Sequence, residues 1–153
     1  MKKILVGMDF SKGALNALDY AIEVAKNTQS EITLVWIEPK SNDKMLPGEK
    51  NEIRHEAKMD LQKIITEKQK ANVGLKITFK QKKGRIYHEM ASVAKSVNAD
   101  LVIIGTHGIG GFEEFWVGSN AFKIISYCPC PVISVRTDYQ RGGKVRKIIL
   151  PID

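Results

Sequence analysis

The chain has few cysteines and no long uncharged hydrophobic run, and both absences narrow its class. Its 153 residues include two cysteines, Cys128 and Cys130, separated by a single proline. One such pair is not a disulfide framework, and without a second pair it makes a poor zinc site. We expect buried, reduced thiols, because free cysteine usually packs as a small hydrophobic residue. No run reaches membrane-spanning length, and Asp9 interrupts the apolar run at the N-terminus before it resembles a signal peptide. We therefore expect a cytoplasmic protein with no membrane partner.

Two common phosphate-binding patterns are also missing. The P-loop pattern G-x-x-x-x-G-K-[ST] does not occur, and G-x-G-x-x-G fails because Glu113 stands where the last glycine after Gly108 and Gly110 should be. No motif pairs a nucleophile with a base near any of the three histidines, which are His55, His88 and His107. The sequence therefore indicates no dedicated catalytic set, and we expect any nucleotide hydrolysis to be slow.

The net charge of +7 raises the question of nucleic-acid binding. The densest basic stretch is 80–85, and neither an RNA-binding signature nor a run of stacking aromatics accompanies it. Most other lysines alternate with glutamates, as on a solvated helix face. Nucleic acid is therefore not an expected partner, although a basic protein attracts any anionic nucleotide in a general way.

Hydrophobic periodicity predicts alternating strands and helices. The expected strands are 3–8, 31–37, 75–79, 100–104 and 131–136. The first expected helix begins at Ser11, and three further helices are expected at 51–71, 86–97 and 119–127. Asp9 or Ser11 would cap the first helix, the stretch 39–48 has loop composition, and the alternation of 75–79 suggests a half-exposed edge strand. This order predicts an α/β fold with a parallel sheet covered on both faces.

The most informative segment is Gly105-Thr106-His107-Gly108, nine further residues, and then Gly118-Ser119. It follows an apolar strand and leads into a helix. Glycines let the main chain approach a ligand closely, and the free N–H groups at a helix start attract anions. Ser119 could cap that helix or bind a phosphate oxygen. The segment therefore predicts a nucleotide site.

The spacing G-x2-G-x9-G-[ST] resembles the ATP-binding signature of the universal stress protein (UspA) family, and the resemblance extends from Lys2 to Arg136. It implies an open, Rossmann-like sheet of five parallel strands in the order 3-2-1-4-5. In that order the winding reverses between the first and fourth strands, where open α/β sheets bind ligands. The resemblance also implies bound ATP, with or without Mg²⁺, and pairing of the strand at 132–136 with a second copy or a second similar domain.

The resemblance also implies particular site residues. Asp9 would approach the ribose hydroxyls or a metal-bound water, or only cap the first helix. Gly7 and Met8 would line the adenine, and Val35 and Trp36 would border the base, although Trp36 could equally be a core residue. The full implied nucleotide-binding set is Gly7, Met8, Asp9, Val35, Trp36, Gly105, Thr106, His107, Gly108, Gly110, Gly118, Ser119 and Asn120. One departure is the pair Glu113 and Glu114 in the spacer, where many relatives carry a basic residue.

The end of the sequence repeats its beginning. Residues 146–153 reproduce the order of 2–9: a basic pair, an apolar run, a small or proline residue, an apolar residue and an aspartate. We therefore expect a domain at 1–136, a linker at 137–145 and the first strand of a second similar domain at 146–153. The alternative is a C-terminal strand that joins the sheet edge of this domain or of a partner.

Three functions remain open at this point. The first is a nucleotide-binding regulatory module for stress responses, without a dedicated catalytic set. The second is a dimerising interaction module that binds no nucleotide, in which the glycine run only forms a turn. The third is a weak metal-dependent ATPase or phosphotransferase that uses Asp9.

Overall fold

The computed structural model describes residues 2–39, 45–106 and 119–138. It contains five parallel strands in the order β3-β2-β1-β4-β5, as the resemblance implies. The strands are β1 (Lys3–Gly7), β2 (Glu31–Pro39), β3 (Ile77–Gly84), β4 (Leu101–Gly105) and β5 (Val132–Val135). The helices are α1 (Lys12–Thr28), α2 (Pro47–Ala71), α3 (Ile86–Val97) and α4 (Ser119–Tyr127). The predicted fold class is confirmed.

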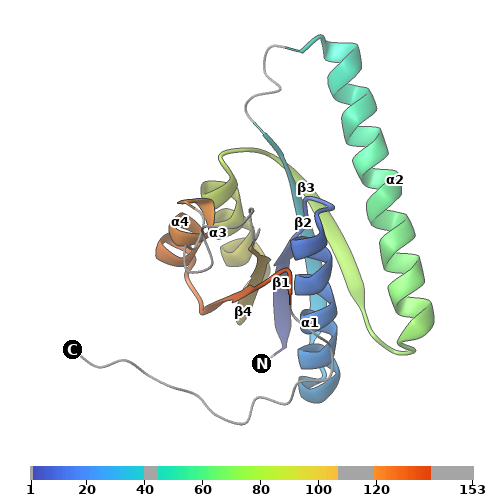
Figure 1. Cartoon of the computed structure of the whole chain (residues 1–153), viewed down its shortest axis with the longest axis vertical. Helices are drawn as coiled ribbons and strands as arrows, with labels where there is room; N and C mark the ends of the chain where they lie inside the picture. The colour runs from blue at the N-terminus through green and yellow to red at the C-terminus, as the bar shows by residue number, and fades with distance from the viewer. Residues whose placement is uncertain (1, 40–44, 107–118, 139–153) are drawn as a thin grey trace.

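The sheet separates two hydrophobic layers. Figure 1 shows α1 and α2 on one face and α3 and α4 on the other. Successive residues of β1 alternate between these layers: Ile4 and Val6 pack with α1 and α2, whereas Leu5 packs with α3 and α4. A strand buried on both faces has a continuous apolar sequence, and this explains the unbroken runs that predicted β1 and β4.

Helix α1 begins where the sequence predicts. Ser11 is the N-cap, and its hydroxyl accepts a hydrogen bond from the Ala14 N–H at 3.2 Å. The helix ends at Thr28, and the C-cap residue Gln29 has a φ of 52°. In this left-handed conformation its N–H reaches back to the Ala25 carbonyl and satisfies one of the final orphan acceptors.

Helix α2 begins earlier than the sequence predicts. It includes Pro47 and Gly48, which the composition assigns to a loop, whereas 40–44 lies outside the described residues. Proline suits the first helical turn because the N–H groups of that turn have no acceptor within the helix, so the N–H that proline lacks is not missed. The Glu49 carboxylate also accepts a hydrogen bond from the Leu46 N–H at 2.9 Å. These two features favour a helix start that loop composition conceals.

Strand β3 lies at the sheet edge, as its alternation predicts, but its boundaries differ. It starts at Ile77 and continues through the basic stretch to Gly84, paired in register with β2 as far as Pro39. Backbone pairing does not depend on side-chain polarity, so a solvated edge strand can contain consecutive lysines. Lys82 and Lys83 are exposed, as the prediction of a solvated basic face requires.

The two cysteines flank the turn between α4 and β5. Both are free, but each is only half-buried, so the expectation of buried thiols is wrong in degree. They pack at the margin of the α3/α4 layer, where a small side chain fits without complete enclosure.

Candidate functional site

The carboxyl ends of β1 and β4 lie side by side at the point where the winding of the sheet reverses. Val6 of β1 pairs with Ile103 of β4, and the helices that follow these strands cover opposite faces. Open α/β sheets leave a crevice at this position, because the two connections diverge. The structure therefore brings the ends of these two strands together, as the resemblance implies.

The turn after β1 is organised by its own polar groups. The Met8 N–H donates to the Val35 carbonyl at 2.9 Å, which continues the pairing with β2 beyond Gly7. The exposed Asp9 accepts from the Ser11 N–H at 3.0 Å. Asp9 thus stabilises the turn before α1, whereas Ser11 is the N-cap of that helix. The position of Asp9 at the carboxyl edge is compatible with a ligand contact.

The sequence gives no sign that Phe10 has a left-handed backbone. Its φ is 64°, which is rare for a bulky residue and costs about 1–2 kcal/mol. Its side chain packs against the α1/α2 layer, and this contact holds the conformation. The strain lies directly beside Asp9, at the candidate site.

Val35 and Trp36 are neighbours in β2, and their side chains face opposite sides of the sheet. Val35 belongs to the α3/α4 layer and Trp36 to the α1/α2 layer, and both are buried. Only 8% of the Trp36 surface is exposed. This burial favours the core role for Trp36 over the stacking role, and it leaves the Val35 backbone, which pairs with Met8, as the β2 group at the site.

Gly105 and Thr106 begin the glycine run in close contact with α1. A Cβ built on Gly105 would lie 2.5 Å from the Ala14 nitrogen and closer still to the Gly13 carbonyl. A Cβ on Gly13 would lie 3.0 Å from the Thr106 oxygen. Two glycines therefore let the end of β4 pass directly over the first turn of α1.

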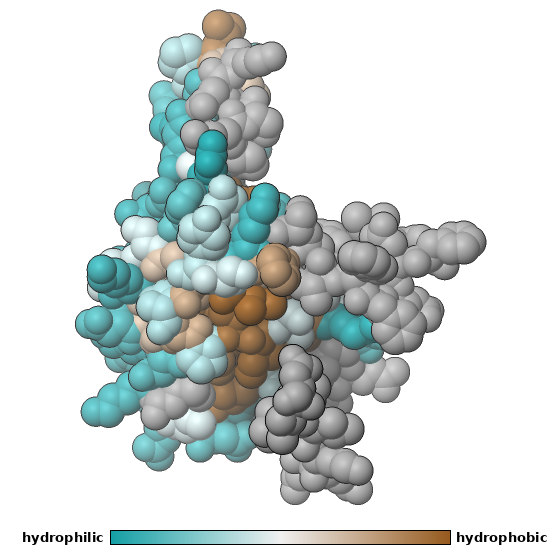
Figure 2. Space-filling model, turned by 90° about the vertical axis from the view of Figure 1, so that its left-hand side faces the viewer, coloured by the Kyte–Doolittle hydropathy of each residue, from teal (hydrophilic) through white to brown (hydrophobic). Residues whose placement is uncertain are grey.

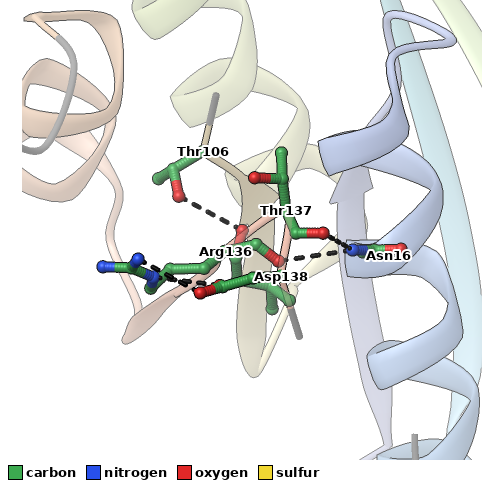
Figure 3. Close-up of polar contacts among 6 residues, drawn as sticks. Asn16, Thr106, Arg136, Thr137 and Asp138 are labelled. Carbon is green, nitrogen blue, oxygen red and sulfur yellow. Dashed lines mark hydrogen bonds and ion pairs between the residues drawn. The ribbon is translucent and has the colours of Figure 1, made fainter. Parts of the chain in front are cut away.

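Thr106 also connects β4 to the end of β5. Its N–H donates to the Val135 carbonyl at 2.8 Å, and its hydroxyl donates to the same oxygen at 3.3 Å. Beyond β5, the Asn16 amide of α1 donates to the Thr137 carbonyl at 2.7 Å and to the Arg136 carbonyl at 3.4 Å (Figure 3). The rim of the candidate site is therefore a network of α1, β4 and the segment after β5.

Part of the predicted set lies outside the described residues, namely His107, Gly108, Gly110 and Gly118, as do Glu113 and Glu114. Ser119 is the first residue of α4, and Asn120 is exposed in its first turn. Because α4 connects two parallel strands, it must run back from the carboxyl edge. Its start therefore lies at the same edge as Asp9 and Thr106.

Sequence reasoning missed Gly13, Asn16 and Arg136. Glycine within a helix costs about 1 kcal/mol relative to alanine, so Gly13 carried a usable signal of close packing. Asparagine is similarly unfavourable at a helix interior, and Asn16 is retained there by its two acceptors beyond β5. Nothing in the sequence distinguishes Arg136 from the other surface cations.

An ion pair between buried Glu38 and half-exposed Arg54 lies farther along the carboxyl edge, between β2 and α2. Glu38 is 1% exposed, and its Oε2 accepts from the Arg54 Nε at 2.6 Å. Its Oε1 has no hydrogen-bond partner within the described part of the chain. The pair joins α2 to the sheet, and this makes it a structural feature of the edge rather than a part of the β1/β4 crevice.

The described residues contain no cluster of three or more His, Cys, Asp or Glu side chains arranged to hold a metal ion. Within the same residues, no helix has the length and hydrophobicity needed to span a membrane. The described part of the edge offers backbone groups, hydroxyls, a guanidinium and several carboxylates, and a polar organic ligand binds through groups of this kind.

Comparison with known proteins identifies the group to which this fold and edge belong. The model of the universal stress protein family matches residues 1–136. Universal stress protein YxiE of Bacillus subtilis is 30% identical over 145 residues, which are 88% of this chain and 98% of that protein. The chain therefore belongs to the universal stress protein family.

Solved structures agree on the fold. Protein MJ0577 is 25% identical with a TM-score of 0.70, and the match covers 88% of this chain and 95% of that one. A universal stress protein in complex with cAMP is 20% identical, with a TM-score of 0.67 over 89% of this chain and 97% of that one. An Arabidopsis thaliana family member with AMP bound is 17% identical, with a TM-score of 0.63 over 89% and 92% of the two chains.

Proposed function

We propose that this protein is a regulatory module that binds ATP, with or without Mg²⁺, at the carboxyl edge of β1 and β4. The observation that carries the proposal is the motif G-x2-G-x9-G-S, which begins at the end of β4 and ends at the first residue of α4. Backbone N–H groups of such a segment and the positive end of α4 would bind phosphates. The cAMP-bound and AMP-bound relatives support adenine nucleotides as the ligand class.

The proposed site uses the predicted residues in two parts. Asp9 and the backbone of Gly7, Met8 and Val35 would hold the nucleoside. The glycine run would hold the phosphates, with Thr106 at its start and the α4 residues Ser119 and Asn120 at its end. The close contact of Gly105 with Gly13 supports this division, because it fixes the start of the run against α1.

The direct test is calorimetric titration of the purified protein with ATP and Mg²⁺, alongside mass spectrometry of nucleotide released on denaturation. Gly118→Val should weaken ATP binding at least tenfold while the protein stays folded, because the branched side chain would obstruct the phosphate cradle. Gly48→Val, which places the same side chain where a Cβ meets nothing within 4 Å, is the matched control. Unchanged affinity in folded Gly118→Val would refute the site.

A second candidate function is an interaction module that holds no nucleotide. Glu113 and Glu114 in the spacer favour it, because two carboxylates near a triphosphate repel it. Absence of any nucleotide signal in a well-folded protein would favour this function. Steady phosphate release that Asp9→Asn abolishes would instead indicate the metal-dependent ATPase.

We also propose that the protein associates through β5. Among the described residues this strand pairs with β4 alone, and the neighbouring helix α4 exposes Phe122 and Ile125. Figure 2 shows hydrophobic residues gathered on the side of the molecule where α3 and α4 lie. A second copy would continue the sheet, or the second domain predicted from 146–153 would take its place.

Strand geometry allows a specific test of this association. The carbonyls of Pro131 and Val135 accept from the N–H groups of Val102 and Thr106, so alternation directs the Ser134 N–H toward the side of β5 that faces away from β4. Ser134→Pro should therefore remove an intermolecular hydrogen bond without breaking the β4–β5 pairing. Sedimentation velocity should show fewer dimers for Ser134→Pro than for Ser134→Thr, and equal dimer fractions would contradict pairing through β5.

A further inference from the structure

Arg136 is the first residue after β5, and it lies beside the start of the glycine run. Gly105 pairs in register with Val135, and the Thr106 N–H donates to the Val135 carbonyl at 2.8 Å. Arg136 therefore stands next to the residue from which the glycine run leaves the sheet. The described structure thus places a cation at the phosphate end of the proposed site.

The backbone of Arg136 is held in place while its side chain stays accessible. Asn16 donates to the carbonyls of Arg136 and Thr137, and this fixes the chain against α1 (Figure 3). The side chain of Arg136 is 59% exposed. A fixed backbone with an exposed guanidinium lets the charged group reorient without a change in the fold.

The guanidinium points to the α4 side of the sheet. Val132 packs in the α3/α4 layer and Val135 in the α1/α2 layer, so continued alternation directs Arg136 toward α4. Figure 3 shows the guanidinium extending away from Asn16 and α1. The start of α4 lies at this same edge and on this same face, because the helix runs back between parallel strands.

In the present structure the guanidinium holds a carboxylate in a two-point contact. Arg136 Nε donates to Asp138 Oδ1 at 3.0 Å, and Nη2 donates to Oδ2 at 3.2 Å. The Arg136 hydrogen bonds lower the pKa of Asp138, so the carboxylate is ionised at neutral pH. A guanidinium binds phosphate with the same fork geometry, and an exposed ion pair of this kind exchanges readily.

We propose that Arg136 is a phosphate-binding residue that favours nucleotides with two or three phosphates over monophosphates. On binding, its guanidinium leaves Asp138 for a non-bridging oxygen of a phosphate beyond the first. Asp138 is then an internal competitor that occupies the guanidinium when no polyphosphate is bound. This assignment rests on the proposed nucleotide site and adds the group that selects among its ligands.

The test compares ATP, ADP, AMP and adenosine by calorimetry in the wild type and in four variants. Arg136→Gln should weaken ATP and ADP about tenfold and change AMP and adenosine less than twofold. Arg136→Lys keeps the charge but loses the fork, so its loss for ATP should be intermediate. Asp138→Asn should strengthen ATP about twofold to threefold by removing the competitor. Lys95→Gln removes one exposed positive charge in the last turn of α3, at the end of the helix away from the proposed site. This control should change no affinity by more than twofold.

Arg136→Gln removes the attraction between the guanidinium and the phosphates, and it also leaves the Asp138 carboxylate unpaired, where it could repel them. The double variant Arg136→Gln with Asp138→Asn removes both groups and so separates these two effects. It should bind ATP about 20-fold to 30-fold more weakly than Asp138→Asn alone, because Asp138 has no guanidinium to occupy once Arg136 is removed. If Arg136→Gln leaves the ATP-to-AMP affinity ratio unchanged, or weakens adenosine equally, the role of Arg136 is refuted and the nucleotide site stands. If the folded wild type binds none of the four ligands, the proposed function itself fails.

Discussion

Adding one methyl group at Gly105 should destabilise the protein strongly, because that methyl would collide with backbone rather than with a movable side chain. The new Cβ would lie 2.5 Å from the Ala14 nitrogen and closer to the Gly13 carbonyl. Relief requires the end of β4 to move away from α1 by about 1 Å, since ordinary carbon contacts lie near 3.5–4.0 Å. Overpacking of this kind costs about 1–3 kcal/mol, and rigid backbone on both sides puts Gly105→Ala at the upper end.

The measurement is thermal unfolding. About 3 kcal/mol corresponds to a decrease of roughly 6–12 °C in Tm for a chain of this size. Gly48→Ala and Gly7→Ala are the controls, because their new Cβ atoms meet nothing within 4 Å and ordinary contacts at 3.6 Å, respectively. A Tm for Gly105→Ala within about 2 °C of the wild type would show that β4 and α1 separate easily, and it would refute the proposed rigid start of the glycine run.

Three other effects follow from charges and burial. Asp100 accepts hydrogen bonds from two backbone N–H groups at the start of β1, which lower its pKa. Its stabilising effect is thus complete above its ordinary pKa and is lost as pH falls through the lowered value. Wild type and Asp100→Asn should therefore differ in unfolding free energy at pH 7 and converge as the pH falls through the lowered pKa of Asp100. Burial raises the pKa of Cys128 to about 11, which lowers its thiolate fraction at pH 8 about 100-fold. Because a more basic thiolate is about tenfold more nucleophilic, Cys128 should react with a disulfide reagent roughly tenfold more slowly than an unperturbed thiol, measured in a Cys130→Ser background. Arg54→Ala should cost about 2 kcal/mol by denaturant unfolding, because it leaves buried Glu38 without its partner.

Each of these has a result that would contradict it. A constant Asp100→Asn difference from pH 7 to pH 2 would mean that the carboxylate charge is not what stabilises the strand. Labelling of folded Cys128 at the rate of an unperturbed thiol would contradict its raised pKa. Lys76→Ala breaks the exposed pair with Glu31 and should cost under about 1 kcal/mol. An Arg54→Ala cost no larger than that would contradict the penalty expected for leaving buried Glu38 unpaired.

Local patterns predicted most of the architecture. The boundaries of α3 and the N-cap of α1 follow from side-chain periodicity and capping chemistry, both of which depend on neighbours in the sequence. The start of α2 was missed because Pro47 and Gly48 are typical of loops as well as of first helical turns. The length of β3 was missed because its pairing depends on the backbone of β2 and not on its lysine side chains.

The site was less predictable, because its geometry depends on residues far apart in the sequence. The resemblance placed Asp9 and Thr106 at one edge, and the structure agrees. It could not show that Gly13 lies under Gly105, or that Asn16 holds the chain after β5, since these contacts exist only after the sheet has formed. Trp36 was ambiguous because an aromatic residue at a strand end serves equally well in a core and at a ligand.

The two edge strands of the sheet, β3 and β5, differ in length. Strand β3 is eight residues long and paired along its length, whereas β5 has four residues. Local opening is least costly where few backbone hydrogen bonds must break, so amide hydrogens of β5 should exchange before those of β3. The short edge is also the one attached to Thr106 and Arg136. A ligand at the carboxyl edge would therefore register as slower hydrogen exchange in β5, with little change of shape elsewhere.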